Sequence, residues 1–286
     1  MVGKHRRSWR VALVLAGLLA LLAGPPALRT AAAQTATFQL VPFGERLGGD
    51  ALRMLREVFP DLRADGTATR YAGVPAVPGA VDDEATKSAI GTFDLASDRT
   101  RPPVHAVLKD GATNYTVVLA ADILVVAQTA PDYVYGGALF VRTDPGGPAS
   151  IESAFVAAAG VVLVLVRNAH HNSQEAFADY LLAGIVDGKL ALLHVGPSLY
   201  SFSDGGPACD DRTVTQRLEG FRPLARGRDG YPDIAMEVVQ EGECRTAGRT
   251  VRLATKRATA VLTWAAGQKK YVGDPLAFEG LSRRPP

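Results

Sequence analysis

The sequence contains none of the short motifs that identify the common enzyme classes. A nucleophile elbow (GxSxG), the zinc motif HExxH, the phosphate-binding loop GxxxxGK[ST] and the dinucleotide-binding GxGxxG are all absent from its 286 residues. Each of these motifs positions a nucleophile, a metal or a phosphate through local geometry. Their absence removes the usual sequence evidence for catalysis, although a triad can still assemble from distant residues. We therefore predict no cofactor and expect binding rather than catalysis.

Cysteine is scarce, and Cys209 and Cys244 are the only two in the chain. Two cysteines this far apart, with no CxxC pair, do not suggest a zinc site. In an exported protein, which has left the reducing cytosol, two cysteines are expected to form one disulfide. A pair of free thiols is the alternative for a chain that stays inside the cell.

Long apolar runs are limited to one stretch near the amino terminus. Val11–Gly24 is a 14-residue apolar run that follows four Lys and Arg residues and precedes the small residues Ala31–Ala33. This order is typical of a secretory signal peptide, and the run is shorter than the ~20 residues that a membrane span needs. We therefore predict a cleaved signal peptide over residues 1–33 rather than a membrane anchor. The leader is rich in Ala and Arg, which favours a bacterial protein that is periplasmic or secreted and leaves the membrane after cleavage.

The mature chain lacks an excess of positive charge. The leader holds five Lys and Arg residues and no acid, so its removal leaves 26 basic against 29 acidic residues. A mildly acidic protein has no electrostatic reason to bind nucleic acid or anionic membranes. The expected partner is therefore an exported protein, a peptide or a glycan.

Strand patterns dominate the rest of the chain, most clearly from Gly160 to Pro197. Val161–Val166 (VVLVLV) contains no polar residue, which predicts a central strand buried on both faces. Ala178–Val186 and Lys189–Val195 predict two further strands, joined by Asp187-Gly188. Asp-Gly supplies the two positive-φ positions of a type I′ hairpin turn. This stretch therefore predicts three antiparallel strands.

About a dozen strand patterns, separated by turns rich in Gly and Asp, predict a mainly β protein with antiparallel sheets. Groups of three or four strands between longer loops favour a propeller-like array, with a sandwich or a barrel as the alternatives. One or two short N-terminal helices are expected, over Leu47–Phe59 and after Asp82. We expect residues 34–103 to form a strand, a helix and a Pro/Gly-rich connector packed on an antiparallel β-domain of residues 104–286. Ser150–Ala159 fits either a strand or a short helix.

The densest polar group in the sequence follows the apolar strand, in the expected loop after Val166. Imidazoles and carboxylates are the usual ligands of zinc, copper and nickel. The candidate metal ligands are His170, His171, Glu175, Asp179 and His194. If the hairpin pairs symmetrically about its turn, His194 lies opposite Leu181 and near the two loop histidines. The alternative interpretation is a surface turn, in which the loop side chains hydrogen-bond the backbone.

A second candidate site is aromatic, in the loop pattern around Tyr133 and Tyr135. Amphipathic rings at the ends of strands bind sugars or peptides, but they also pack at the edge of a core. The candidate ligand-contact residues of both sites are His170, His171, Asn172, Tyr133 and Tyr135.

Two hypotheses for the function follow from these observations. The first is an exported binding or interaction module without enzymatic activity, of unknown process. The alternative is an exported hydrolase or metalloprotein that uses the His170/His171 loop. An enzyme should bring imidazole and carboxylate groups together in a concave pocket, whereas a binding module should present a surface without such a group.

Overall fold

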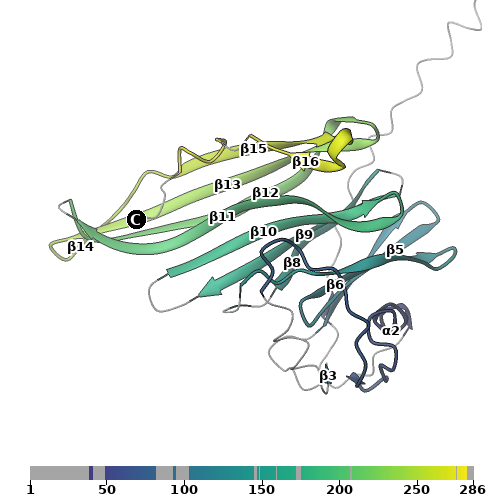
Figure 1. Ribbon diagram of the computed structural model, residues 1–286. Helices are drawn as coiled ribbons and strands as arrows, with labels where there is room; N and C mark the ends of the chain where they lie inside the picture. Colours follow the sequence, from purple (N-terminus) through teal and green to yellow (C-terminus); the bar gives the residue numbers. More distant parts are fainter. Residues whose placement is uncertain are drawn as a thin grey trace, which may run out of the picture. The chain divides into compact units, whose positions relative to one another are not determined.

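The computed structural model describes residues 39–40, 49–81, 93–94, 103–144, 147, 149–158, 160–171, 175–206, 208–274 and 276–281. This part of the chain is mainly β, as predicted, with two large antiparallel sheets and one α-helix (Figure 1). The helix, α2, spans Gly49–Arg56 and confirms the helix expected over Leu47–Phe59. The predicted signal peptide and the segment after Asp82 lie outside the described residues.

The smaller sheet has the order β1-β4-β5-β6-β7, and all of its strands are antiparallel. Four long strands form its body, because β1 contributes only two residues. The strands are β1 (Gln39–Leu40), β4 (Val104–Asp110), β5 (Thr113–Ala120), β6 (Ile123–Ala130) and β7 (Val134–Phe140). A separate two-residue ladder joins β2 (Thr67–Ala68) to β3 (Phe93–Asp94). One face of the smaller sheet packs on α2 and the turn after it, where Met54, Leu55 and Phe59 are fully buried.

The larger sheet has the order β16-β15-β13-β12-β11-β10-β9-β8, with β14 paired to β13. Its first four strands are β8 (Ala149–Ala158), β9 (Val161–His171), β10 (Glu175–Val186) and β11 (Lys189–Gly206). The others are β12 (Cys209–Arg228), β13 (Tyr231–Thr246), β14 (Arg249–Arg252), β15 (Lys256–Ala265) and β16 (Lys270–Val272), with the 3-10 turn η2 (Ala266–Gln268) before β16. Within the stretch Ser150–Ala159, the described residues up to Ala158 are thus a strand.

Strand β9 is buried on both faces, as predicted, and all of Val161–Val166 is at most 9% exposed. Val162, Val164 and Val166 face the smaller sheet and form the inter-sheet core with side chains of β4–β7. Leu163 and Leu165 point the other way, because side chains alternate along a strand. They belong to a second large core, here called the fold-over core, together with apolar side chains of β13, β15 and β16.

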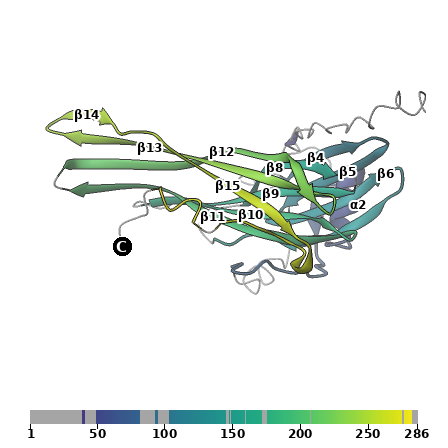
Figure 2. The ribbon, with the colours of Figure 1, turned by 90° about the horizontal axis from the view of Figure 1, so that it is seen from above.

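The larger sheet therefore folds over on itself, so that β13, β15 and β16 cover the face of β8–β11 that points away from the smaller sheet (Figure 2). Among the described strands neither a closed barrel nor a ring of propeller blades forms. The preference for a propeller-like array was wrong, and the face-to-face packing of two sheets corresponds to the sandwich alternative. The physical reason is that β11 pairs edge to edge with β12 over Ser201–Gly206, which joins two strand groups into one sheet.

Tight turns with two positive-φ residues join several strands. Asp187 and Gly188 have φ values of 52° and 74°, which confirms the turn predicted between β10 and β11. Asp229 and Gly230 have φ values of 53° and 79° and join β12 to β13 in the same way. This second Asp-Gly pair was present in the sequence and predicts the long β12–β13 hairpin that the strand patterns alone missed.

The turn between β5 and β6 provides a test of backbone strain. Ala121 and Asp122 have φ values of 49° and 62°, although neither is glycine. The left-handed conformation costs a non-glycine residue about 1–2 kcal/mol. Replacing alanine with glycine costs less, about 0.4–1 kcal/mol, because it increases the conformational entropy of the unfolded chain. We expect Ala121→Gly to raise the free energy of unfolding by about 0.5 kcal/mol in urea titrations. Ala112→Gly, at a turn position without positive φ, is the matched control and should lower it; equal losses in both variants would contradict the strain argument.

Candidate functional site

His170 and His171 lie within a strand and not in the predicted loop. The pairing of β9 with β10 continues to His171, opposite Ala176, and the pairing with β8 continues to Asn168. Strand β10 gives the backbone of both histidines a pairing partner, and this tertiary context overrides the polar composition that favoured a turn. His171 is the last residue of β9, so the end predicted for this strand, Val166, was five residues too early.

The imidazole of His170 is held by a carboxylate and by an aromatic stack. Its Nδ1 lies 2.9 Å from Oδ1 of Asp144, and the two side chains are 20% and 11% exposed. The ring stacks on Phe177, its partner across β10, with centroids 4.6 Å apart and planes 12° apart. Phe177 is in turn 6.0 Å from the ring of Tyr200 on β11. The rings stand side by side across three strands, so the stack supports the orientation of His170.

A buried amide anchors the segment that carries Asp144. Asn168 is fully buried on the same face of β9 as His170. Its Nδ2 donates to the carbonyl of Val141 at 2.9 Å, and its Oδ1 accepts from the backbone N–H of Thr143 at 3.1 Å. These bonds hold the chain after β7 against β9. Sequence reasoning missed Asp144, which stands in a turn pattern, and Asn168, whose only signal was a polar residue soon after an apolar strand.

The structure does not bring His171 or Asp179 to His170, and the side chain of Glu175 lies outside the described part of the chain. His171 is exposed and alternates to the opposite face of β9. Oδ1 of Asp179 accepts a hydrogen bond from Oγ of Ser198 at 2.5 Å. Glu175 begins β10, opposite Phe202. Asn172 lies outside the described residues.

The prediction for His194 was wrong. It pairs with Leu182 rather than Leu181, next to an irregularity in the β10–β11 register. The hairpin continues to the pair formed by Phe177 and Tyr200 and beyond, so His194 lies in the middle of its strand. Five residues of β10 separate it from the level of His170, about 16 Å at the usual strand rise. Among the described residues, no group of three or more His, Cys, Asp or Glu side chains could hold a metal ion.

The two candidate tyrosines, Tyr133 and Tyr135, lie against α2. The guanidinium of Arg53 sits 3.6 Å from the ring centroid of Tyr133, whose hydroxyl donates to Oε1 of Glu57 at 3.5 Å. Burial, with a smaller contribution from Glu57, raises the pKa of Tyr133 to about 12. Burial also raises the pKa of Tyr135. Both rings pack on the helix side of the smaller sheet, so their apolar faces contribute to the core beside α2.

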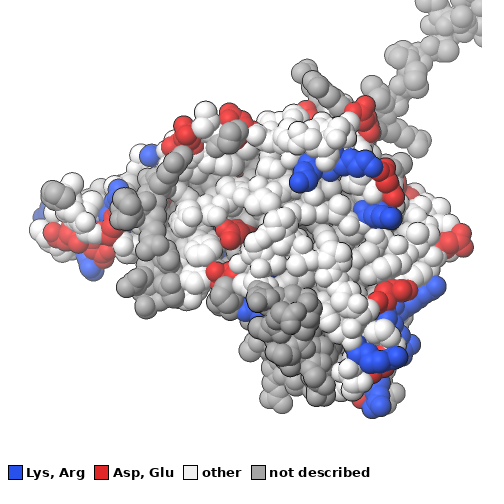
Figure 3. All heavy atoms as spheres, viewed as in Figure 1, with Lys and Arg blue, Asp and Glu red and all other residues white. Residues whose placement is uncertain are grey.

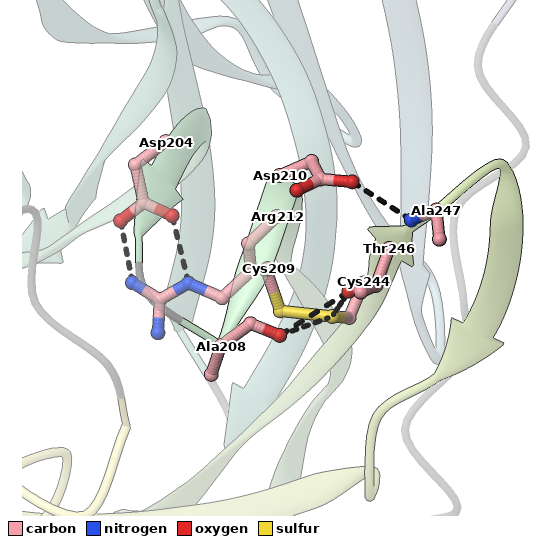
Figure 4. Close-up of a disulfide and its surroundings, with 8 residues drawn as sticks. All are labelled: Asp204, Ala208, Cys209, Asp210, Arg212, Cys244, Thr246 and Ala247. Atoms are coloured by element: carbon pink, nitrogen blue, oxygen red, sulfur yellow. Dashed lines mark hydrogen bonds and ion pairs between the residues drawn. A yellow bond between two sulfur atoms is a disulfide. The ribbon is translucent and has the colours of Figure 1, made fainter.

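Cys209 and Cys244 form a disulfide, as predicted, with Cα atoms 5.5 Å apart (Figure 4). The bond joins the start of β12 to the end of β13, in a part of the larger sheet here called the β-finger. The β-finger comprises residues 203–206, 208–216 and 241–256. Figures 1 and 2 show these strand ends together with β14, at the end of the larger sheet away from α2. None of the described residues of the β-finger belongs to the large hydrophobic cores.

Polar contacts replace a core in the β-finger. Arg212 binds both carboxylate oxygens of Asp204, at 2.8 and 2.5 Å, and its hydrogen bond holds the pKa of Asp204 below the ordinary value (Figure 4). Oδ2 of Asp210 accepts from the backbone N–H of Ala247 at 2.8 Å. Apolar burial is limited to a small contact around Val214, whereas Val251 on β14 is 62% exposed. Figure 3 shows acidic and basic side chains intermixed at this end of the molecule.

No protein-family model matches the sequence, and comparison with curated proteins and with solved structures finds no match. Within the described ranges no helix is long and apolar enough to cross a membrane.

Proposed function

We propose that this protein is an exported interaction module without enzymatic activity, which contacts a partner protein through the β-finger. The observation that carries this proposal is a sheet extension ordered by a disulfide and ion pairs instead of a core. Ordering a residue costs about 1–2 kcal/mol of backbone entropy, which burial normally offsets. Strands that are ordered without packing on a hydrophobic core keep both of their faces available for contact with a partner.

Rigidity is the property that such an extension contributes to binding. A surface that is already ordered loses less entropy when a partner docks, so more of the contact energy appears as affinity. The disulfide and the contacts of Arg212 and Asp210 supply this order. Export is consistent with the same bond, because disulfides persist in oxidising compartments. The basic and apolar amino terminus supports export independently.

The composition of the β-finger favours a protein partner over a glycan. Its residues include no Phe, Tyr or Trp, and aromatic rings are the amphipathic surfaces expected to contact sugars. It carries instead ion pairs between side chains of opposite charge, such as Arg245 with Asp211 and Arg252 with Glu243. Patterned charge of this kind supports selective docking against a complementary protein surface.

Site-specific photo-crosslinking tests the proposal. A photoreactive amino acid at Val251, in the β-finger, is expected to trap a defined adduct in cells that make the protein. The same group at Val107, an exposed valine 46% accessible on β4, is the matched control and should not trap it. A Cys209→Ser/Cys244→Ser background should weaken the Val251 adduct, because the surface is no longer held rigid. Identical adducts from both positions, or none from Val251, would refute the proposal.

The hydrolase alternative has one supporting observation, the contact between His170 and Asp144. A carboxylate at Nδ1 fixes the tautomer and orientation of an imidazole, as it does in Ser-His-Asp triads. A serine-hydrolase probe such as a fluorophosphonate distinguishes the two functions. Labelling of the purified protein that disappears in His170→Ala would favour the hydrolase, whereas no labelling is expected of an interaction module.

A further inference from the structure

The carboxyl-terminal segment closes the fold-over core. Residues 266–274 and 276–281, here called the strap, contribute Tyr271 (2% exposed) and Leu281 (6% exposed) to that core. The ring of Tyr271 packs edge-on against Trp264 of β15, with centroids 5.3 Å apart. Its hydroxyl donates to the carbonyl of Pro232 at 3.0 Å. The strap therefore covers apolar surface that it shares with β13 and β15.

The strap has few attachments to the strands on the other side of this core. Strand β16 forms only three residue pairs with β15, and β12 pairs with β11 only from Ser201 onward. At the level of β16 the link to β11 is a hydrogen bond from Nδ1 of His194 to the carbonyl of Tyr271, 3.1 Å long. Lys269 adds an exposed ion pair with Asp187 in the β10–β11 turn. His194 is thus the partly buried contact between the strap and β11.

We propose that the strap is a latch that is closed when His194 is neutral and opens when His194 is protonated. A carbonyl oxygen only accepts, so Nδ1 carries the proton of the neutral ring and a second proton would enter at Nε2. That proton places a positive charge on His194, whose contact with the strap is partly shielded from water. The described residues give His194 no carboxylate partner, so the charge would be poorly compensated.

The charged groups around the latch do not offset this cost. Those on the elements that pack beside His194 are Asp179 on β10, Lys189 and Asp204 on β11, Asp187 in the β10–β11 turn, and Lys269, Lys270, Asp274 and Glu279 on the strap. Asp187 pairs with Lys269, Asp204 pairs with Arg212, and none of these charges contributes to the pKa shift of His194. Burial accordingly lowers the pKa of His194 below its ordinary value, and the bond to Tyr271 opposes this only in part.

The closed strap is expected to lose stability as the pH falls, because the pKa of His194 is lower in the closed form. A histidine in an open strap titrates near its ordinary pKa of 6.5, while the closed form titrates lower. Between these two values the open form binds more protons, so falling pH favours opening. The stabilisation is complete above about pH 6.5 and is lost as the pH falls toward the lower pKa of the closed form. Opening would expose the fold-over core beside β11 in mildly acidic surroundings.

Hydrogen exchange of the whole protein tests the latch. The rates at pH 7.5 and 5.5 are compared after correction for intrinsic exchange. Amides of β16 are expected to open up to about tenfold more at pH 5.5, while amides of the central strand β9 stay unchanged. His194→Gln, which keeps an N–H donor but does not titrate, should remove the difference.

The matched control for this comparison is His171→Gln, because His171 is exposed on β9. This variant should retain the pH effect of the wild type. Equal corrected protection of β16 at both pH values in the wild type would overturn the proposal. So would a pH effect that persists in His194→Gln.

Discussion

Replacing Cys209 and Cys244 together with serine is expected to lower the free energy of unfolding by about 3–4 kcal/mol. The two cysteines are 35 residues apart, and in the chain-entropy model a cross-link over that interval removes this much freedom from the unfolded state. Because net stabilities are about 5–15 kcal/mol, the loss is large. Urea denaturation of the variant and the wild type measures it.

The variant should also open locally in the β-finger, because no large core supports it. Hydrogen exchange is expected to accelerate most at β14 and at the adjoining ends of β12 and β13, while β9 loses protection only by the change in the global free energy of unfolding. Reductant gives the matched control, since it should shift the wild type toward the variant and leave the variant unchanged. A double-serine variant as stable as the wild type would show that ion pairs such as Arg212 with Asp204 suffice.

Replacing Leu165 with alanine is expected to cost about 2–5 kcal/mol of unfolding free energy. Leu165 is fully buried in the fold-over core, on the face of β9 that β13 and β15 cover. Truncating it loses the transfer free energy of three side-chain carbons, Cγ and the two Cδ methyl groups, and leaves a cavity that close-packed neighbours fill only in part.

Val107→Ala is the control for this measurement, because Val107 is 46% exposed on β4 and should change stability by no more than about 0.5 kcal/mol. Both variants are compared by urea denaturation at constant pH. A cost below about 1 kcal/mol at Leu165 would mean that the two halves of the larger sheet do not pack as described.

Several elements of the fold could be predicted because their causes are local in the sequence. The apolar run Val161–Val166 favoured burial on both faces, Asp187-Gly188 favoured a tight hairpin turn, and the residues of Leu47–Phe59 favoured a helix. The disulfide could be predicted from the cysteine count and the expected export, since two cysteines allow only one pairing. Each conclusion depended on neighbouring residues or on a single possible partner.

The tertiary structure alone decided the position of the site residues. Asp144 meets His170 because the bonds of Asn168 hold the segment after β7 against β9, a contact between residues far apart in the chain. His194 meets Tyr271 instead of the two histidines of β9 because β10 and β11 extend past their predicted ends. Strand length and register depend on which strands pair and on what covers each face. Strand length and register are set by many weak interactions between segments far apart in the chain, so no local pattern of residues specifies them. They determined where both the β-finger and the latch form.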